Sequence, residues 1–473
     1  MTDNINNHMK RILIVLAVLT CILDVRAQNR FDGLYAGLPL DLSSPELPAI
    51  PDTRVNLADC GVKGDGVTLC TDAFRTAIAE LSAAGGGHLD VPAGVWLTGP
   101  IVLASHIDLH LEAGALVIFT PDKHAYVDGE LKNRVNPCIF AQKCTDISIT
   151  GKGILDGNGK YWRYAKRDKL SDPEWKDLLK LGGSVSEDGK LWFPTELKGY
   201  RNLTDSPEKE ESIRQNMIVL RGCTRVLISG VTVQNSPKFH ITPNRCADIA
   251  IEGVTVRCPW NAQNGDGIDI AHCQRVLITG CTVDVGDDGI CMKGGSGEKG
   301  LKDGVCSDIL ICDNVVFHAH GGFVIGSDVS GGMERIVVKD CTFSGTDTGL
   351  RFKSAMGRGG HCEDIFISDI RMNDIREAAV TFNCDYANVT YVNLSAGDDT
   401  SAFAPDFGGI SISGVVCREC PVAVYAHGID GLECIHDVNI SSSTFLYLKK
   451  ATDIDSSTAS LSFTDVEFVP ARF

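Results

Sequence analysis

The sequence is poor in aromatic residues, in basic residues and in long hydrophobic runs. Aromatic side chains make up 7% of its 473 residues, so aliphatic and small side chains must fill its core. Lysine and arginine number 44 against 61 acidic residues, giving a net charge of −17. This balance argues against nucleic acid as a partner, because phosphate binding draws on basic surface. An anionic ligand would need a local basic cluster.

The one long apolar stretch lies near the N-terminus and is typical of a secretory signal. Lys10 and Arg11 precede the run ILIVLAVLTCIL, and the small residues of VRA end just before Gln28. The run is too short to predict a membrane span, and no other stretch is long and apolar enough for one. We therefore expect a signal peptide over residues 1–27 and a protein that is periplasmic or secreted. Two alternatives stay open: a buried N-terminal strand and a lipid anchor at Cys21.

The nineteen cysteines follow a repeat that indicates buried positions rather than disulfides or metal ligands. Short segments, each with an apolar residue, two polar residues and an alternating strand, begin at Cys144, Cys223, Cys246, Cys273, Cys306, Met333 and Cys362. Methionine cannot form a disulfide, so we interpret these positions as one ladder of medium apolar side chains, one per coil of a solenoid. Individual disulfides stay open, with Cys417 and Cys420 the nearest pair.

The repeating strands favour a parallel β-helix over a sandwich or a propeller. They are short, β-branched and separated by glycine, asparagine and aspartate, and from Cys223 onward they recur mostly every 23 to 33 residues. We expect an all-β, single-domain, right-handed parallel β-helix over residues 54–473, after a lead segment at 28–53. Residues 71–87 predict a short N-terminal capping helix, with Thr71 or Asp72 as N-cap and glycines as its stop.

A charged segment interrupts the repeat between residues 158 and 215. It carries Trp162, Trp175 and Trp192. We interpret it as a long insertion lying over one face of the β-helix. At least two of its three tryptophans are expected to pack the insertion rather than to stack on a sugar.

Aligning the coils places four glycines at the start of one strand in consecutive coils: Gly267, Gly289, Gly322 and Gly349. By strand alternation, the residue after each glycine points inward and the next one points out. The turn before and the strand after these glycines then form one outer strip, which holds Asp266, Asp287, Asp288, His320, Lys293, Arg351 and Lys353. Crowded carboxylates repel one another, so at least one is expected to have a raised pKa. Neighbouring acids with separated pKa values are what glycoside cleavage uses.

At these residues the sequence resembles the family 28 glycoside hydrolases, the polygalacturonases and their relatives. The family signatures are Asn-Thr-Asp-Gly, Gly-Asp-Asp, Gly-His-Gly and Arg-Ile-Lys. In the same order, this chain has NGDG at 264–267, GDD at 286–288, AHGG at 319–322 and RFK at 351–353. The resemblance extends over about residues 54–470. Three positions depart from the signatures: Gly265 and Ala319, which bear on turn geometry, and Phe352, which is expected to point inward.

The resemblance implies inverting hydrolysis with no metal or organic cofactor. Asp287 would protonate the leaving glycosidic oxygen, while Asp266 and Asp288 hold and deprotonate the attacking water. Inversion requires roughly 6.5–9.5 Å between acid and base. His320 would tune the acid by hydrogen bonding.

The implied substrate is pectic polysaccharide or an oligogalacturonide, cut at α-1,4-galacturonosyl linkages. Arg351 and Lys353 would bind a uronate carboxylate, with Lys293 and Arg358 as further members of the cluster. The stretch HGGFVIGSDVSGG at 320–332 resembles exo-acting bacterial members of the family. A long insertion can close one end of a groove, so we expect attack at chain ends.

Three other functions stay open at this point. The substrate could be rhamnogalacturonan or another pectic backbone. A pectate lyase shares the fold and the anionic substrate, and its calcium could use the aspartates. A non-catalytic glycan-binding solenoid would form no product at all. The sequence leaves the oligomeric state open.

Overall fold

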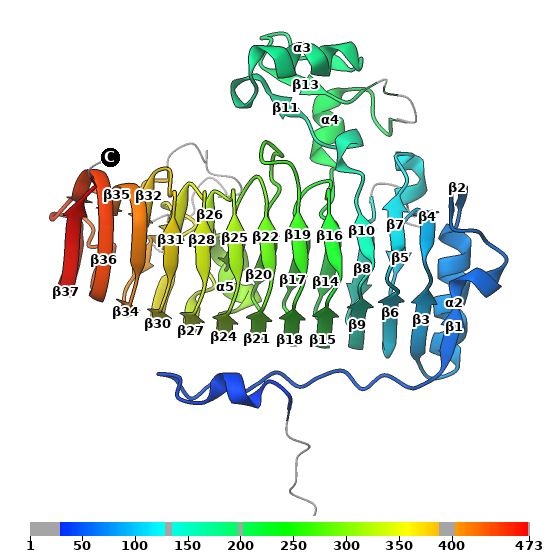
Figure 1. The fold of residues 1–473 in the computed structure, drawn as a ribbon, viewed down its shortest axis with the longest axis horizontal. Coiled ribbons are helices and arrows are strands. Elements are labelled where there is room, and N and C mark those ends of the chain that lie inside the picture. The colour runs from blue at the N-terminus through cyan, green and yellow to red at the C-terminus, as the bar shows by residue number, and fades with distance from the viewer. Residues whose placement is uncertain (1–28, 128–134, 196, 198–201, 387–402, 472–473) are drawn as a thin grey trace, which may run out of the picture.

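The protein is a long parallel β-helix, described by a computed structural model over residues 29–127, 135–195, 197, 202–386 and 403–471 (Figure 1). The predicted signal peptide, residues 1–27, lies outside the described residues. Within these ranges no helix has the length and hydrophobicity needed to cross a membrane.

Successive coils contribute strands to three parallel ladders. The first, here called the site sheet, runs through β5 (Ile101–Val102), β8 (Ile139–Gln142), β14 (Ile218–Arg221), β17 (Ile241–Asn244), β20 (Ile268–Ala271), β23 (Ile290–Lys293), β26 (Gly321–Gly326), β29 (Thr348–Lys353), β32 (Ala378–Asn383) and β35 (Val416–His427). The second, the strap sheet, runs through β1 (Arg54–Asn56), β3 (Gly87–Val91), β6 (Ile107–Leu111), β9 (Thr145–Gly151), β15 (Thr224–Ser229), β18 (Ala247–Glu252), β21 (Gln274–Thr279), β24 (Cys306–Cys312), β27 (Met333–Lys339), β30 (His361–Ser368), β33 (Asp406–Phe407) and β34 (Ile410–Ser413).

The third ladder consists mostly of three-residue strands. It runs through β2 (Asp65–Leu69), β4 (Gly94–Thr98), β7 (Ala115–Phe119), β10 (Ile154–Asp156), β16 (Thr232–Gln234), β19 (Thr255–Arg257), β22 (Thr282–Asp284), β25 (Val315–Phe317), β28 (Thr342–Ser344) and β31 (Arg371–Asn373). The long strands β36 (Ile435–Ile454) and β37 (Ala459–Pro470) form the C-terminal end.

The core is one continuous column of aliphatic side chains inside the coils. Cys306, Met333 and Cys362 stand directly opposite one another in the strap sheet, and all three are buried. The predicted apolar ladder is therefore confirmed. Every cysteine in the described part of the chain is a free thiol, Cys417 and Cys420 included.

Helix α2 (Thr71–Ala83) packs against the first coil through Phe74, Ile78 and Leu81, which are buried. The predicted N-cap is wrong by one or two residues, because Cys70 holds that position without a side-chain hydrogen bond. Thr71 instead accepts a hydrogen bond from the backbone N–H of Gly99 at 2.7 Å, which ties the helix to the coil.

The lead segment from residue 29 to 53 runs along the outside of the strap sheet (Figure 1). One outward position of that sheet is apolar in coil after coil: Leu227, Ala250, Leu277, Leu310, Val337 and Phe366. Phe31 and Leu42 of the lead segment are buried against this row. The lead segment thus shields an apolar stripe that would otherwise face water.

Between β10 and β14 the chain leaves the coils and forms the insertion that projects above them in Figure 1. It contains an antiparallel sheet of β11 (Ala165–Lys166), β12 (Ser184–Val185) and β13 (Leu191–Phe193), with helices α3 (Asp172–Lys180) and α4 (Pro207–Ser212). Trp162 and Trp192 are buried, so two of the three tryptophans pack the insertion as predicted. Trp175 is half-buried, with Arg167 over its ring.

Candidate active site

The predicted site residues lie where four consecutive strands of the site sheet begin. Ile268, Ile290, Phe323 and Leu350 share one register and are buried, which confirms the alignment of the coils. The turns before these strands are joined by backbone hydrogen bonds. Gly267 N–H donates to Asp288 O and His320 N–H donates to Asp287 O, both at 2.9 Å. These bonds hold the acidic turns at the spacing of adjacent strands.

The glycines that follow the acids are required by packing. A Cβ added at Gly267 would lie 2.6 Å from Val283, and one added at Gly322 would lie 2.3 Å from the Phe343 ring. The chain bends inward here against the third ladder, and only hydrogen fits. The repeated acid-glycine pattern therefore combines a structural glycine with an outward acid.

Asp288 is the carboxylate most strongly held by cations. Lys353 Nζ lies 2.7 Å from its Oδ2, and Arg351 Nη1 lies 3.5 Å from its Oδ1. Burial opposes ionisation, but Lys353, Lys293 and Arg351 outweigh it and hold the pKa of Asp288 far below its ordinary value. Asp288 is thus a fixed negative charge.

Asp266 carries the raised pKa that the crowding predicted. Burial raises its pKa well above the ordinary value, and the Asp269 and Asp287 carboxylates add to this. Lys293 Nζ is 3.5 Å from Asp266 Oδ2, whereas Asp266 Oδ1 is buried without a hydrogen-bond partner among the described residues. Its backbone oxygen accepts from Nδ1 of the buried His240 at 2.8 Å.

Asp287 is coupled to His320. The distance from His320 Nδ1 to Asp287 Oδ1 is 3.1 Å, as the predicted tuning role requires. Burial raises the pKa of Asp287, but the hydrogen bond with His320 outweighs it and holds the pKa below its ordinary value. The pKa values of Asp266 and Asp287 are thus displaced in opposite directions.

Asp269 is a fourth carboxylate of the site that the sequence analysis missed. It lies on β20 in register with the outward-facing position of Arg351 on β29. Burial raises its pKa to about 7, although Lys293, 3.8 Å away, opposes the shift. The alternation rule that placed Arg351 outside applies equally to the residue two positions after Gly267. That signal was present in the sequence.

Among the described contacts, Arg358 has none with the four carboxylates of the site. Its Nη1 donates to Ser327 Oγ at 2.7 Å and lies 3.3 Å from Asp328. Lys293, by contrast, joins the cluster through Asp266 and Asp269. Arg351 and Lys353 also lie beside the Tyr386 ring, 5.7 Å and 5.2 Å from its centroid.

Packing explains two of the three departures from the family signatures, those at Gly265 and Phe352. A Cβ at Gly265 would lie 2.8 Å from Cys258 Sγ, so threonine does not fit this turn. Ala319 is buried. Phe352 points inward as predicted and stacks on Phe382, with ring centroids 4.4 Å apart.

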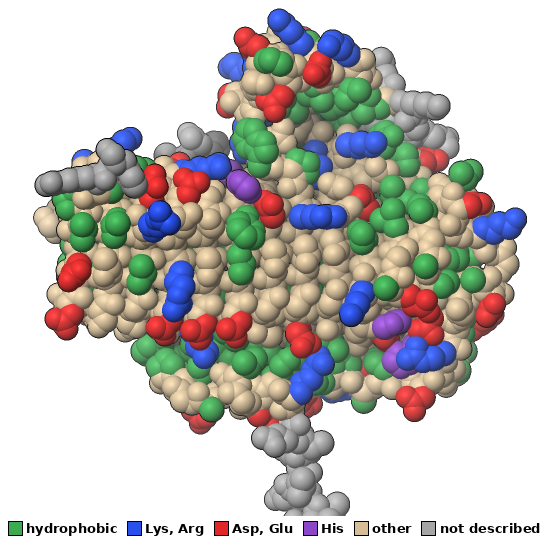
Figure 2. Space-filling model, in the orientation of Figure 1, with side chains coloured by type: hydrophobic (Ala, Val, Ile, Leu, Met, Phe, Trp, Pro, Cys, Tyr) green, Lys and Arg blue, Asp and Glu red, His purple; other side chains and the backbone are tan. Residues whose placement is uncertain are grey.

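One hollow adjoins the carboxylates, and a second lies beneath the insertion. The first, of about 450 Å³, extends from Asp269 and Lys293 toward earlier coils, where Arg221 and Phe239 line it. The second, of about 520 Å³, lies between the insertion and the loop at 259–262, and its lining includes Tyr164 and Trp192. Figure 2 shows the insertion rising above the coils, with acidic and basic side chains gathered at its foot.

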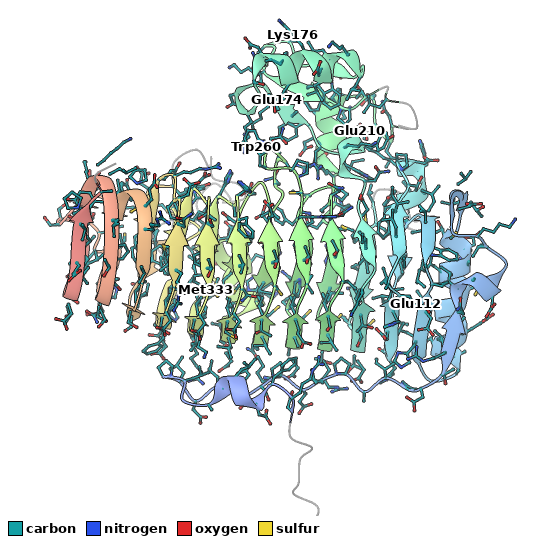
Figure 3. The ribbon with its side chains drawn as sticks, in the orientation of Figure 1. Glu112, Glu174, Lys176, Glu210, Trp260 and Met333 are labelled. Atoms are coloured by element: carbon teal, nitrogen blue, oxygen red, sulfur yellow. The ribbon has the colours of Figure 1, made fainter. Side chains whose placement is uncertain are left out.

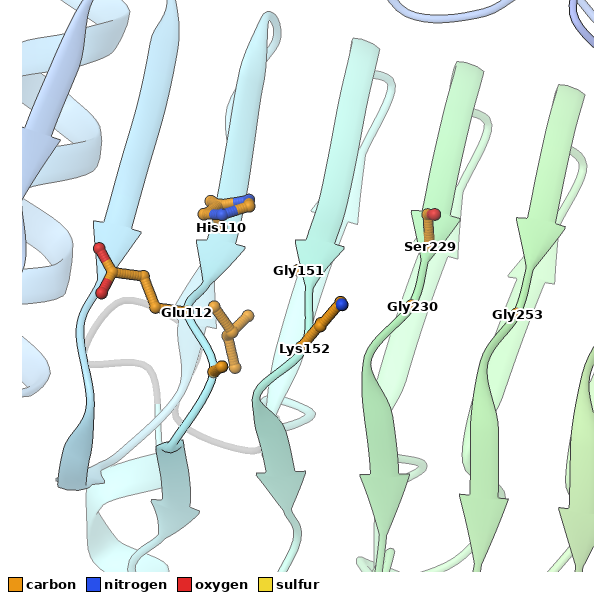
Figure 4. Close-up of a pocket in the computed structure, with 9 residues that line it drawn as sticks. His110, Glu112, Gly151, Lys152, Ser229, Gly230 and Gly253 are labelled. Atoms are coloured by element: carbon orange, nitrogen blue, oxygen red, sulfur yellow. The ribbon is translucent and has the colours of Figure 1, made fainter.

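A third hollow is separate from the site. It measures about 810 Å³ and lies at the turns that follow strap-sheet strands, between His110, Glu112 and Lys152 (Figure 4). Glycines 151, 230 and 253 form its floor, and none of its lining residues belongs to the predicted site.

One set of donors within the site could hold a metal ion. Asp287, Asp288 and His320 each offer one ligand atom, and these atoms lie within 4.8 Å of one another. Lys353 and Arg351 already neutralise Asp288, so a cation there would compete with two fixed positive charges. A second set, Glu334, His361 and Glu363, lies on the strap sheet away from the site.

The parallel β-helix thus carries carboxylates paired with cations on consecutive strands of its site sheet. The chain belongs to glycosyl hydrolases family 28, whose family model matches residues 83–444. It is 28% identical over 354 residues to the exo-poly-alpha-D-galacturonosidase of Dickeya chrysanthemi, covering 72% of this chain and 58% of that protein. It is 30% identical over 340 residues to a probable polygalacturonase of Vitis vinifera, covering 68% of this chain and 61% of that protein.

The matched region thus spans less than two thirds of either curated relative. Among solved structures, the chain is similar to the exopolygalacturonase of Thermotoga maritima, with a TM-score of 0.74 and 29% identity. That match covers 91% of this chain and 95% of the other. It supports the predicted right-handed β-helix.

Proposed function

We propose that the protein is an inverting glycoside hydrolase that cleaves α-1,4-galacturonosyl linkages of pectin from chain ends. The observation that carries this proposal is the pairing of carboxylates with Lys353, Arg351 and Lys293 in one groove. Acids alone would suit any glycoside. Three cations beside them suit a sugar that is itself a carboxylate.

In this mechanism Asp287 protonates the leaving oxygen, and Asp266 with Asp288 binds and deprotonates the attacking water. The unpartnered oxygen of Asp266 supports its role toward water. The active form requires a protonated Asp287 and an ionised Asp266, whereas in the ligand-free protein the pKa of Asp266 is raised and that of Asp287 is lowered. The pH–rate profile therefore reports pKa values of the coupled group rather than of either residue alone.

Attack at chain ends is supported by the insertion, which faces the loop at 259–262 and contacts His320 through Lys169, and by the exo-acting enzymes named among the similar proteins. We also propose that residues 1–27 direct export, since a polymeric substrate does not enter the cytoplasm. The mature protein would then comprise the lead segment, the β-helix and the insertion.

The function is tested by product analysis on polygalacturonate and rhamnogalacturonan side by side. We expect saturated monogalacturonate from polygalacturonate and little product from rhamnogalacturonan. Preferential cleavage of rhamnogalacturonan would move the proposal to another pectic backbone. An unsaturated, ultraviolet-absorbing product that disappears with chelator would identify a lyase.

A further inference from the structure

The insertion reaches into the candidate active site through Lys169. Its Nζ lies 3.4 Å from His320 Nε2, on the side of the imidazole opposite Asp287. Lys169 is the last residue of a short 3-10 turn, Arg167–Lys169, that follows β11. Tyr164, also in the insertion, is within electrostatic reach of the same acid, because Asp287 contributes to raising its pKa after burial and Glu211.

The turn that carries Lys169 is fixed. Arg167 N–H donates to Lys190 O at 2.8 Å, and Arg167 Nη1 donates to Leu170 O at 2.7 Å. Arg167 also pairs with Asp172 at the start of α3. The main chain on both sides of Lys169 is therefore held in place.

The insertion as a whole is fastened to the catalytic loops. Arg214, whose side chain is fully buried, donates to Pro237 O, Gln263 O and Asn264 Oδ1 at 2.8, 3.1 and 2.9 Å. Arg163 Nη1 donates to Ser236 O at 2.6 Å. Gln263 and Asn264 lead directly to Asp266, so insertion and acid share one scaffold.

Lys169 differs from the other cations of the site in its charge balance. Lys353 and Arg351 face Asp288, and Lys293 faces Asp266 and Asp269. Among the residues that the structure describes, Lys169 forms no ion pair. Its charge is therefore available to an incoming anion.

We propose that Lys169 binds the carboxylate of the sugar on the leaving-group side of the scissile bond. This inference rests on the proposed function, in which Asp287 must reach the glycosidic oxygen. The sugar bonded through that oxygen then lies next to His320 and Lys169. The insertion is accordingly a specificity element, because it contributes a positive charge to the site from outside the coils.

The test compares Lys169→Met with the wild type on digalacturonate and on digalacturonate methyl-esterified only at the reducing-end residue. Esterification should lower kcat/KM of the wild type and have a much smaller effect on the variant. On the free acid, K169M should raise KM about tenfold with little change in kcat, as expected for a charge-assisted contact kept throughout the reaction. Lys169→Arg should retain part of the preference.

Lys176→Met is the matched control, because Lys176 lies on α3 at the far end of the same insertion (Figure 3). It should behave as the wild type on both substrates. A lower kcat with unchanged KM, equal on both substrates, would overturn the inference and make Lys169 a positioning residue for His320.

Calorimetric binding of trigalacturonate to Asp287→Asn, with and without K169M, separates this inference from the proposed function. Weaker binding in the double variant supports the Lys169 contact even if no hydrolysis is found. Equal binding in the two variants overturns that contact while leaving an active wild-type hydrolase intact. Absence of both binding and cleavage overturns both.

Discussion

At the scale of single residues, Asp266 and Asp287 have pKa values displaced in opposite directions, and their roles can be separated by the leaving group. Asp287→Asn should lower kcat on polygalacturonate by about 10²–10⁴-fold, since proton donation is lost. On an aryl galacturonide with a good leaving group, which needs no acid, the same variant should stay close to wild type. Asp266→Asn should fail on both substrates. The reverse pattern would exchange the two roles.

Lys353 is expected to bind substrate as well as hold Asp288 ionised. Lys353→Met should lower kcat/KM on oligogalacturonate by roughly 10²-fold, because it removes one partner of a buried ion pair. The exposed Lys302, on α5 (Gly297–Asp303), provides the control variant Lys302→Met. If fully methyl-esterified substrate is cut as well as the free acid by the wild type, the carboxylate-binding role is wrong.

The raised pKa of Asp269 makes stability fall as pH rises. Below the ordinary carboxyl pKa both folded and unfolded states are protonated. Between there and about 7 only the folded state keeps the proton, so rising pH lowers the free energy of unfolding, by up to about 4 kcal/mol. Asp269→Asn should remove this part of the pH dependence. Its free energy of unfolding relative to the wild type should therefore be highest at pH 8. Denaturant unfolding at pH 4 and pH 8 measures it.

The control for that experiment is Asp284→Asn, at an exposed carboxylate. Its free energy of unfolding should change with pH as that of the wild type does. If the free energy of unfolding of Asp269→Asn changes between pH 4 and pH 8 as much as that of the wild type, the pKa assigned to Asp269 is wrong. Alternation from Gly267 pointed to Asp269 as clearly as it pointed to Arg351. Lys169 could not be predicted, because its contact depends on how the insertion folds back over the coils.

At the scale of elements, the glycine at the start of each site strand packs its backbone directly against core side chains of the third ladder. Gly322→Ala would place a methyl group 2.3 Å from Phe343, whose ring is buried, and should cost about 1–3 kcal/mol of unfolding free energy. Gly33→Ala, which meets nothing within 4 Å, should be nearly neutral. Equal midpoints in denaturant for the two variants would show that the site turn tolerates a side chain.

Strand pattern predicted the sheets well because inward positions must be apolar in every coil. It did not predict the lead segment's role. The outward apolar row through Leu227, Leu277 and Leu310 signals a covered surface, but its cover comes from residues far away in the sequence. Helix α2 was predicted from its capping residue and the glycines that end it, yet the predicted N-cap was wrong, because Thr71 binds Gly99 of the next coil.

At the scale of the whole molecule, the β-helix aligns the site residues on consecutive coils, and the insertion adds Lys169 beside His320. The repeat in the sequence was sufficient to predict the solenoid, since each coil buries the same positions. The insertion has no repeat, so the sequence gives its bounds but not its orientation. Figure 1 shows it rising above the coils near β16, β19 and β22, the same coils that precede the acidic turns.

The proposed inverting attack at the ends of polygalacturonate is tested by proton NMR of the first-formed product. We expect monogalacturonate from the first minutes, with the β configuration at its new anomeric carbon, while viscosity falls slowly. Initial product with the α configuration, or an early ladder of oligosaccharides with a rapid loss of viscosity, would contradict it.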